Sequence, residues 1–407
     1  MRADFRPSRH AVWKPRSILH VSGPVALKMA TPHSDPVQSL NALVDSALTL
    51  VQQLKGALAD IQRGSASGAQ GSDSTSRRDG EPAEPVDALQ LAKDAAALIK
   101  AHATKLSLLI ITEPLTPSAI STVVRELVAG PLAALATAVE LCTPGSYTKD
   151  FQHELLWRSQ GVYTGLVDLL QKIPRNGQVL VGSAKNGSAG GKGSLTSTGV
   201  LWSACDGVVE LADQGLRGFY VHKIGEWKGT IRDVAEELKE WGEEEPEEDE
   251  EEGASSDTEQ AGSPSTSGPS AQEMVDDFMG SSGTIPRDDP DGIRPRLESA
   301  VRCLRLTVIL CMAIDKRRMK KLPSSMPTKS IVTRLSEASE QLRQLPEDFG
   351  DLAAAFYELD PEEIDETMER CCSRAVAIGE TLNLGWDGET DEFTEWMLKF
   401  RSEMRKT

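Results

Sequence analysis

Hydrophobic residues are scarce in this chain of 407 residues, where they make up 39%, below the range typical of a globular protein. Part of the chain is therefore expected to remain unpacked. The shortfall is concentrated in three stretches rich in Gly, Ser, Pro or acidic residues, at 63–85, 174–197 and 243–290. Such stretches bury too little apolar surface to offset the entropy lost on ordering, so we interpret them as loops and linkers.

Positive charge is also in deficit, because 44 Lys and Arg face 62 Asp and Glu, which gives a formal charge of −18. This balance disfavours a phosphate backbone, so we expect no direct nucleic-acid partner. Long apolar runs are missing as well. The richest run, at 106–111, is far shorter than the roughly 18 residues that a membrane-spanning helix needs. We therefore expect a soluble protein with no membrane partner.

Motifs for catalysis and metal binding are missing from the sequence. The six histidines are scattered and form neither an HExxH pattern nor a zinc-ligand spacing. The glycine-rich stretch 186–194 lacks the Ser or Thr that would follow Lys192 in a phosphate-binding loop, and no strand precedes it. We expect a protein that is not an enzyme and uses no cofactor and no metal.

Cysteines are few and show no paired spacing. The six of them lie in otherwise apolar helical patterns, which favours reduced core thiols over disulfides. The adjacent Cys371 and Cys372 would point in different directions on a helix, so we expect no bond between them.

Helical periodicity fills the sequence between the linkers. Apolar residues recur at spacings of three and four, as at Leu155, Val162, Leu166 and Leu169. No convincing series of strands is present. The fold class is therefore predicted to be all-α, with two helical bundles joined by an acidic disordered linker.

The predicted domain organisation follows the linkers. We expect a disordered basic leader over 1–36 and an N-terminal helical bundle over 37–242, with loops at 63–85 and 174–197. An acidic and Ser-rich disordered linker follows over 243–290, and a C-terminal helical bundle over 291–407. The domain boundary is placed in the acidic linker, because its run of Glu and Asp repels itself and extends.

The basic leader has two interpretations. Its six Lys and Arg against one acid resemble a mitochondrial transit peptide. The alternative is an upstream extension with a second start at Met29. We favour the extension, because Pro7, Pro15 and Pro24 would interrupt the amphipathic helix of an import signal.

Prolines predict several helix boundaries. Pro117 suits the first position of a helix, and Pro131 predicts a kink or a break. Near the C-terminus we expect separate helices at 330–345 and 349–359, with Asp360 capping the helix that follows.

Two segments of the first half carry a family resemblance. Residues 107–141 combine a helix, a Leu-Pro break and a second helix, and residues 201–211 form a Trp-x-x-Cys helix with Trp202 and Cys205. Both segments resemble the cyclin-D-binding family of cell-cycle regulators, of the GCIP or Maid type.

The second half carries the resemblance further, since 297–311 and 346–359 are similar to helices of the family's C-terminal half. The resemblance implies a two-bundle adaptor that binds cyclin or helix-loop-helix partners and restrains cell-cycle progression or transcription, in cytoplasm and nucleus. The same helix pattern would also support a scaffold of the vinculin or catenin type that tethers structural partners.

One helical stripe is a candidate partner-binding seam. Its members follow one another at spacings of four and three: Trp227, Ile231, Val234, Leu238 and Trp241. Two tryptophans on one stripe would make a good binding anchor if they were exposed. The alternative interpretation is packing inside the bundle.

Two further candidate sites are charged. A basic cluster could act as a nuclear-import patch, or it could complement the C-terminus of a helix: Lys316, Arg317, Arg318, Lys320 and Lys321. Ser255 and Ser256 lie among acids in the linker and are candidate phosphorylation sites. The alternative for these serines is a solvated spacer.

Overall fold

The computed structural model describes residues 35–66, 86–187, 191–244, 284–323 and 327–406. Throughout these ranges the regular structure is helical and no β-strand occurs. The predicted all-α class is confirmed. The helices form two compact units, one running up to Thr143 and continuing over Lys149–Asp213, the other made of Pro144–Thr148 and the chain from Gln214 onward.

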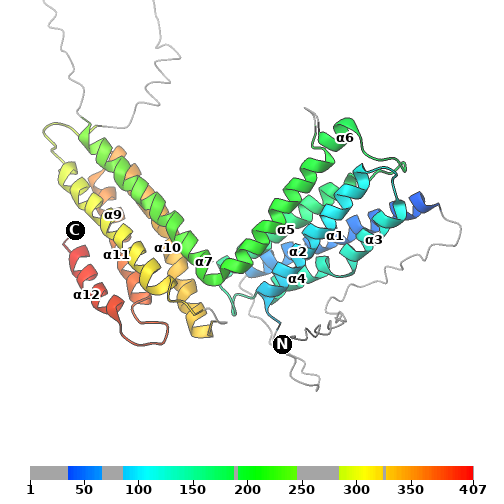
Figure 1. The fold of residues 1–407 in the computed structure, drawn as a ribbon. Helices are drawn as coiled ribbons and strands as arrows, with labels where there is room; N and C mark the ends of the chain where they lie inside the picture. Colours follow the sequence, from blue (N-terminus) through cyan, green and yellow to red (C-terminus); the bar gives the residue numbers. More distant parts are fainter. Residues whose placement is uncertain (1–34, 67–85, 188–190, 245–283, 324–326, 407) are drawn as a thin grey trace, which may run out of the picture. The chain divides into compact units, whose positions relative to one another are not determined.

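The first unit is a helical bundle whose helices lie side by side (Figure 1). Its elements are α1 (Pro36–Ala66), α2 (Ala88–Ile111), α3 (Pro117–Ala129), α4 (Pro131–Leu141), α5 (Lys149–Gln171), the short α6 (Gly182–Asn186) and the first part of α7 (Ser194–Glu243). The core is built mainly from Leu, Ile, Val and Ala on the inner faces of these helices. This is the pattern that the apolar spacing of three and four predicts.

The predicted interruption at Pro131 is a complete break. Helix α3 ends at Ala129, Gly130 leaves the helical conformation, and Pro131 becomes the first residue of α4. Proline is tolerated there because its missing N–H would be unpaired in any case. The buried Tyr163 hydroxyl donates to the Leu132 carbonyl at 2.7 Å and ties α5 to the start of α4.

The stretch Pro117–Leu141 passes a test for membrane-spanning helices by length and composition alone. Half of its most apolar window is buried inside the protein, and the helix is interrupted at Gly130. Core helices of soluble proteins pass the same test, so the stretch is weak evidence for a membrane segment.

The second unit contains the rest of α7, α9 (Ile293–Ile314), the π-helical turn η1 (Asp315–Met319), α10 (Lys329–Tyr357), α11 (Pro361–Thr381) and α12 (Glu392–Met404). Gly215, with φ 58° and ψ −169°, interrupts α7 at the point where the chain passes from one unit to the other. The short segment Pro144–Thr148 belongs to this unit, where the Tyr220 hydroxyl donates to Thr148 Oγ1 at 2.6 Å.

The division between the units differs from the prediction. The sequence placed the boundary in the acidic stretch 243–290, whereas the compact units separate between Asp213 and Gln214. The reason is that α7 after Gly215 buries apolar residues in the second unit, including Trp241 against Phe356, with ring centroids 6.1 Å apart. Most of the acidic stretch, the leader and the loop at 67–85 lie outside the described residues.

Two local predictions are corrected. The loop at 174–197 is partly regular, since it contains α6 and the start of α7, and the Leu180 amide donates to the Ile110 carbonyl at 2.9 Å. The helices at 330–345 and 349–359 are one helix, α10, that runs through Pro346. Buried Leu345 and Phe349 on either side of Pro346 pack into the core, and this packing outweighs the lost backbone hydrogen bond.

Candidate partner-binding surface

Helix α7 lies antiparallel to α2 in the first unit, and three contacts fix their register. Lys100 pairs with Asp206 at 2.6 Å, and Lys93 pairs with Asp213 one heptad earlier in α2. One heptad later, the Thr198 hydroxyl donates to Ser107 Oγ at 2.9 Å. Moving seven residues up α2 therefore moves seven or eight residues down α7.

Helix α5 borders α7 on the other side. Gly165 lies so close to α7 that an added Cβ would come within 3.1 Å of the Leu201 Cα. The guanidinium of Arg158 donates to the Gly207 carbonyl at 2.6 Å. Helix α7 is therefore held between two neighbours, with Leu201 and Cys205 buried beneath it.

The outer side of α2 and α7 carries an apolar surface, which we call the α2–α7 face: Ala101 and Leu108 on α2, and Leu195 and Trp202 on α7. Leu108 is 57% exposed, Leu195 42% and Trp202 38%. The register places Trp202 opposite Thr104, between Ala101 and Leu108 along α2. Large apolar side chains gathered on one surface commonly mark a binding site.

A salt bridge and a buried thiol beside the α2–α7 face stabilise the packing of α2 and α7. The salt bridge between Lys100 and Asp206 holds the two helices together at its edge, and Lys105 is exposed. Burial raises the pKa of the Cys205 thiol to about 12, so this cysteine stays neutral and unreactive beneath the face. The face therefore offers apolar contact area with charges at its rim.

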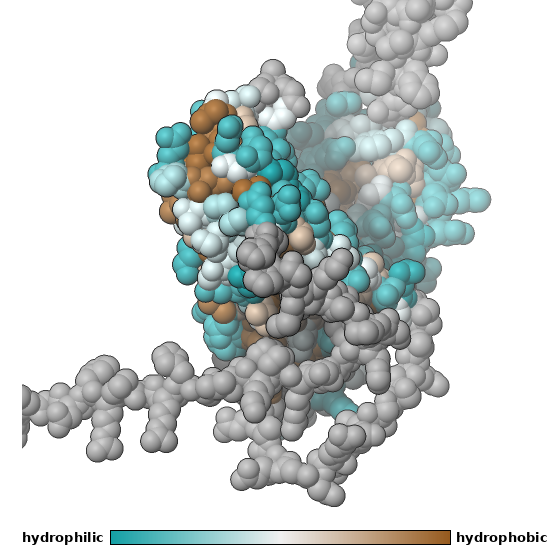
Figure 2. Space-filling model, turned by 90° about the vertical axis from the view of Figure 1, so that its right-hand side faces the viewer, coloured by the Kyte–Doolittle hydropathy of each residue, from teal (hydrophilic) through white to brown (hydrophobic). Residues whose placement is uncertain are grey.

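The surface also gathers apolar residues near α6. Figure 2 shows hydrophobic residues collected in one area of a mainly hydrophilic surface, at about the height of α6 in Figure 1. Val181, just before α6, is 68% exposed. The Leu180 hydrogen bond to Ile110 attaches this segment to the C-terminal end of α2, close to Leu108.

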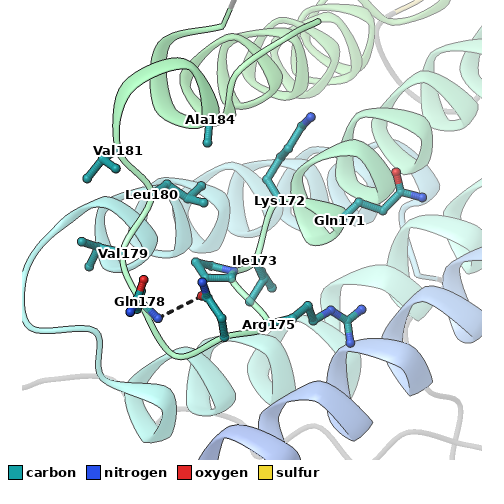
Figure 3. A pocket seen from close by; sticks show the side chains of 11 residues that line it. Gln171, Lys172, Ile173, Arg175, Gln178, Val179, Leu180, Val181 and Ala184 are labelled. Carbon is teal, nitrogen blue, oxygen red and sulfur yellow. Dashed lines mark hydrogen bonds between the residues drawn. The ribbon is translucent and has the colours of Figure 1, made fainter.

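A pocket of about 600 Å³ lies at the same end of the unit (Figure 3). Gln171 and Lys172 at the end of α5 and apolar Val179 and Leu180 line it. Two positively charged residues line it, Lys172 and Arg175, and Arg175 is already used, since its Nη2 bonds Asp45 of α1 at 2.8 Å. We assign no ligand to this pocket.

The predicted seam lies mainly in the core of the second unit. Ile231, Leu238 and Trp241 are buried, and Trp241 also meets Tyr357 edge-on at 5.5 Å between ring centroids. Trp227 and Val234 are half-buried. Packing inside the bundle, the alternative interpretation, describes three of the five members, because they are buried and Trp241 packs on Phe356 and Tyr357 of α10.

The predicted import patch is divided between surface and core. Lys316, Lys320 and Lys321 are exposed, whereas Arg318 is 1% exposed. Both terminal nitrogens of Arg318 bond the Asp391 carboxylate, at 2.8 and 2.9 Å, and Nε donates to the Leu382 carbonyl at 2.7 Å.

Arg318 is thus a structural residue that anchors the start of α12. The neighbouring Arg317 donates to the Glu392 carbonyl at 3.2 Å. The cluster cannot present its five cations together in this conformation, because the π-helical turn η1 directs Arg318 inward. The candidate phosphorylation sites Ser255 and Ser256 lie outside the described residues.

Within the described ranges, no group of three or more His, Cys, Asp or Glu residues is placed to hold a metal ion. His102 Nδ1 lies 3.3 Å from a Glu126 carboxylate oxygen, and burial lowers the pKa of His102. In the sequence Trp202 stands out only as part of a helix motif. Its exposure could be found only once α2, α5 and α7 were placed around it.

The fold and the α2–α7 face define an all-helical protein of two units, with an apolar helical surface on the first. Residues 91–244 match the family model described as Grap2 and cyclin-D-interacting, N-terminal. This match supports a GCIP-like family for the chain. An uncharacterized protein of Schizosaccharomyces pombe is 22% identical over 321 residues, which cover 78% of this chain and 85% of the yeast protein.

Proposed function

We propose that this protein is a non-enzymatic adaptor that binds cyclin or helix-loop-helix partners and thereby restrains cell-cycle progression or transcription. The observation that carries the proposal is the exposed Trp202 in the α2–α7 face, inside the segment that matches a cyclin-D-interacting family. Action in both cytoplasm and nucleus is part of the proposal.

The proposed mechanism is sequestration by helix docking. An amphipathic partner helix has apolar residues at spacings of three and four, which add up to the seven residues that separate Ala101 from Leu108 and Leu195 from Trp202. Tryptophan is the side chain most often found as a binding anchor, and truncating such an anchor typically costs about 2 kcal/mol or more. The exposed Lys105 at the rim would select the charge pattern of the partner.

Binding of the full-length protein to a purified D-type cyclin, and separately to a helix-loop-helix domain, tests the proposal by titration calorimetry. Trp202→Ala should weaken binding about tenfold or more, since each 1.4 kcal/mol corresponds to a factor of ten. Trp157→Ala is the matched control, because Trp157 is 64% exposed on α5, outside the α2–α7 face. It should leave the affinity unchanged.

Each outcome bears on a different part of the proposal. If the wild-type protein binds neither partner, the assigned partner classes are wrong. If a partner binds and both tryptophan variants behave alike, the α2–α7 face is not the binding surface. Circular dichroism of each variant shows that a loss of binding is not a loss of fold.

A further inference from the structure

Helices α9 and α11 of the second unit run parallel, and three contacts with the same sequence offset align them. Arg296 bonds Asp365 through two nitrogens, both at 2.8 Å. Seven residues later, Cys303 and Cys372 bring their sulfur atoms to 2.9 Å. Residues 310 and 379 continue the series, since a Cβ added at Gly379 would lie 3.7 Å from the Leu310 side chain.

This heptad spacing keeps the same faces of α9 and α11 together over two turns on either side of the cysteines. A disulfide requires the two Cβ atoms to approach and to point toward each other. The salt bridge before the cysteine pair and the close approach at Gly379 after it hold the two thiols in register. The two sulfur atoms already lie 2.9 Å apart in the reduced protein.

The two thiols differ in exposure and in acidity. Cys303 is fully buried, whereas Cys372 is half-buried and can be reached by a small solute. A hydrogen bond from Cys303 lowers the pKa of Cys372, and the same bond together with burial raises the pKa of Cys303. The thiolate therefore forms at Cys372. The adjacent Cys371 is buried, and burial raises its pKa.

We propose that Cys303 and Cys372 are a peroxide-responsive modification site that closes to a disulfide between α9 and α11. The Cys372 thiolate attacks one oxygen of hydrogen peroxide, which breaks the O–O bond and gives a sulfenic acid and hydroxide. The Cys303 sulfur then displaces hydroxide from the Cys372 sulfur and loses its proton. Two thiols and one peroxide become one disulfide and two waters, and the two sulfur atoms supply the two electrons.

The disulfide would tie together two helices that are separated in sequence by the whole of α10. Such a cross-link restricts the unfolded chain more than the folded one, so it stabilises the second unit. In a reducing compartment the bond would be transient, as expected of a cysteine pair that responds to oxidants. This inference is independent of the proposed partner binding.

Peptide mapping of the full-length protein tests the proposal. The reduced protein is treated with hydrogen peroxide, its remaining thiols are alkylated, and it is digested without reductant and analysed by mass spectrometry. The expected product is a linked pair of peptides containing Cys303 and Cys372, with a mass two hydrogens below their sum. Cys372→Ser should abolish it, and the matched control Cys371→Ser should retain it.

The melting temperature is a second measurement, and it also shows whether each variant is folded. Peroxide should raise the melting temperature of the wild type and of Cys371→Ser, and it should leave Cys303→Ala and Cys372→Ser unchanged. A link from Cys372 to Cys371 or to a second molecule would overturn the proposal. So would oxidation of Cys372 to a sulfinic acid with no linked peptide.

Discussion

The two units differ in where they place a tryptophan and a charged residue. In the first unit Trp157 and Trp202 are exposed, and the ion pair between Lys93 and Asp213 lies at the surface. In the second unit Trp241 is buried among aromatic rings, and Arg318 is buried against the partly exposed Asp391. Trp241 and Arg318, which the sequence suggests as members of surface sites, are internal.

This contrast shows how a single pattern supports two roles. A tryptophan on an amphipathic stripe faces the core when another helix covers that stripe, as α10 covers Trp241. It stays exposed when no described helix covers it, as for Trp202 on α7 between α2 and α5. Substitutions in each unit can break or sharpen the comparison.

The largest effect is expected for Arg318→Ala. It removes the guanidinium from Asp391 and leaves the Leu382 carbonyl without its donor, and breaking a buried pair in this way costs about 3–5 kcal/mol. Lys316→Ala, on the exposed side of the same turn, should change stability by less than about 0.5 kcal/mol. Urea-induced unfolding measures the free energy of unfolding of both variants. Equal losses would show that Arg318 is not buried.

Leu238→Ala tests the fate of the predicted seam. Leu238 is fully buried, so the substitution should lower the free energy of unfolding by about 2–5 kcal/mol. Val234→Ala, on the same stripe but half-buried, should cost about 1 kcal/mol. Thermal unfolding provides the comparison. If Leu238→Ala costs as little stability as Val234→Ala, Leu238 is not buried and the stripe lies at the surface.

Gly165→Ala probes the packing of the first unit. An added methyl group would crowd the Leu201 backbone, and overpacking of this kind costs about 1–3 kcal/mol. Gly56→Ala in α1 meets open space and should be neutral or stabilise by about 0.5–1 kcal/mol. The melting temperature of Gly165→Ala should therefore fall and that of Gly56→Ala should stay or rise, unless α5 and α7 are less closely packed than the structure indicates.

The acid stability of the second unit should depend on Asp391. Its hydrogen bonds from Arg318 lower its pKa to about 2, below the value of about 3.9 in an unfolded chain. The ionised carboxylate therefore contributes stability above about pH 4, and this contribution, about 1–2 kcal/mol, is lost as the pH falls toward 2. Asp391→Asn should be less stable than the wild type near pH 7, and the gap should narrow near pH 3. A gap that stays constant with pH would refute the assignment.

Periodicity and proline chemistry could be read from the sequence. The all-α class, the break at Pro131 and the cap at Asp360, whose side chain accepts from the Glu362 and Glu363 amides, are local consequences of residue type. Pro346 shows the limit of this reasoning. Its local preference favours a helix end, and the packing of α10 overrides it.

The candidate sites were harder to predict, because they depend on which face of a helix is covered. The stripe with Trp241 and the motif with Trp202 both consist of apolar residues at helical spacing. Cys303 and Cys372 are 69 residues apart, and no local signal links them. The parallel register of α9 and α11 brings them together.

The sequence by itself determined the helices, their caps and many of their breaks, because those depend on contacts within a few residues. Only the tertiary structure decided that the units divide near Gly215, that Arg318 is a core residue and that Trp202 lies at the surface. These outcomes depend on neighbours far apart in the chain. Burial belongs to the assembled helices, so no single helix specifies it.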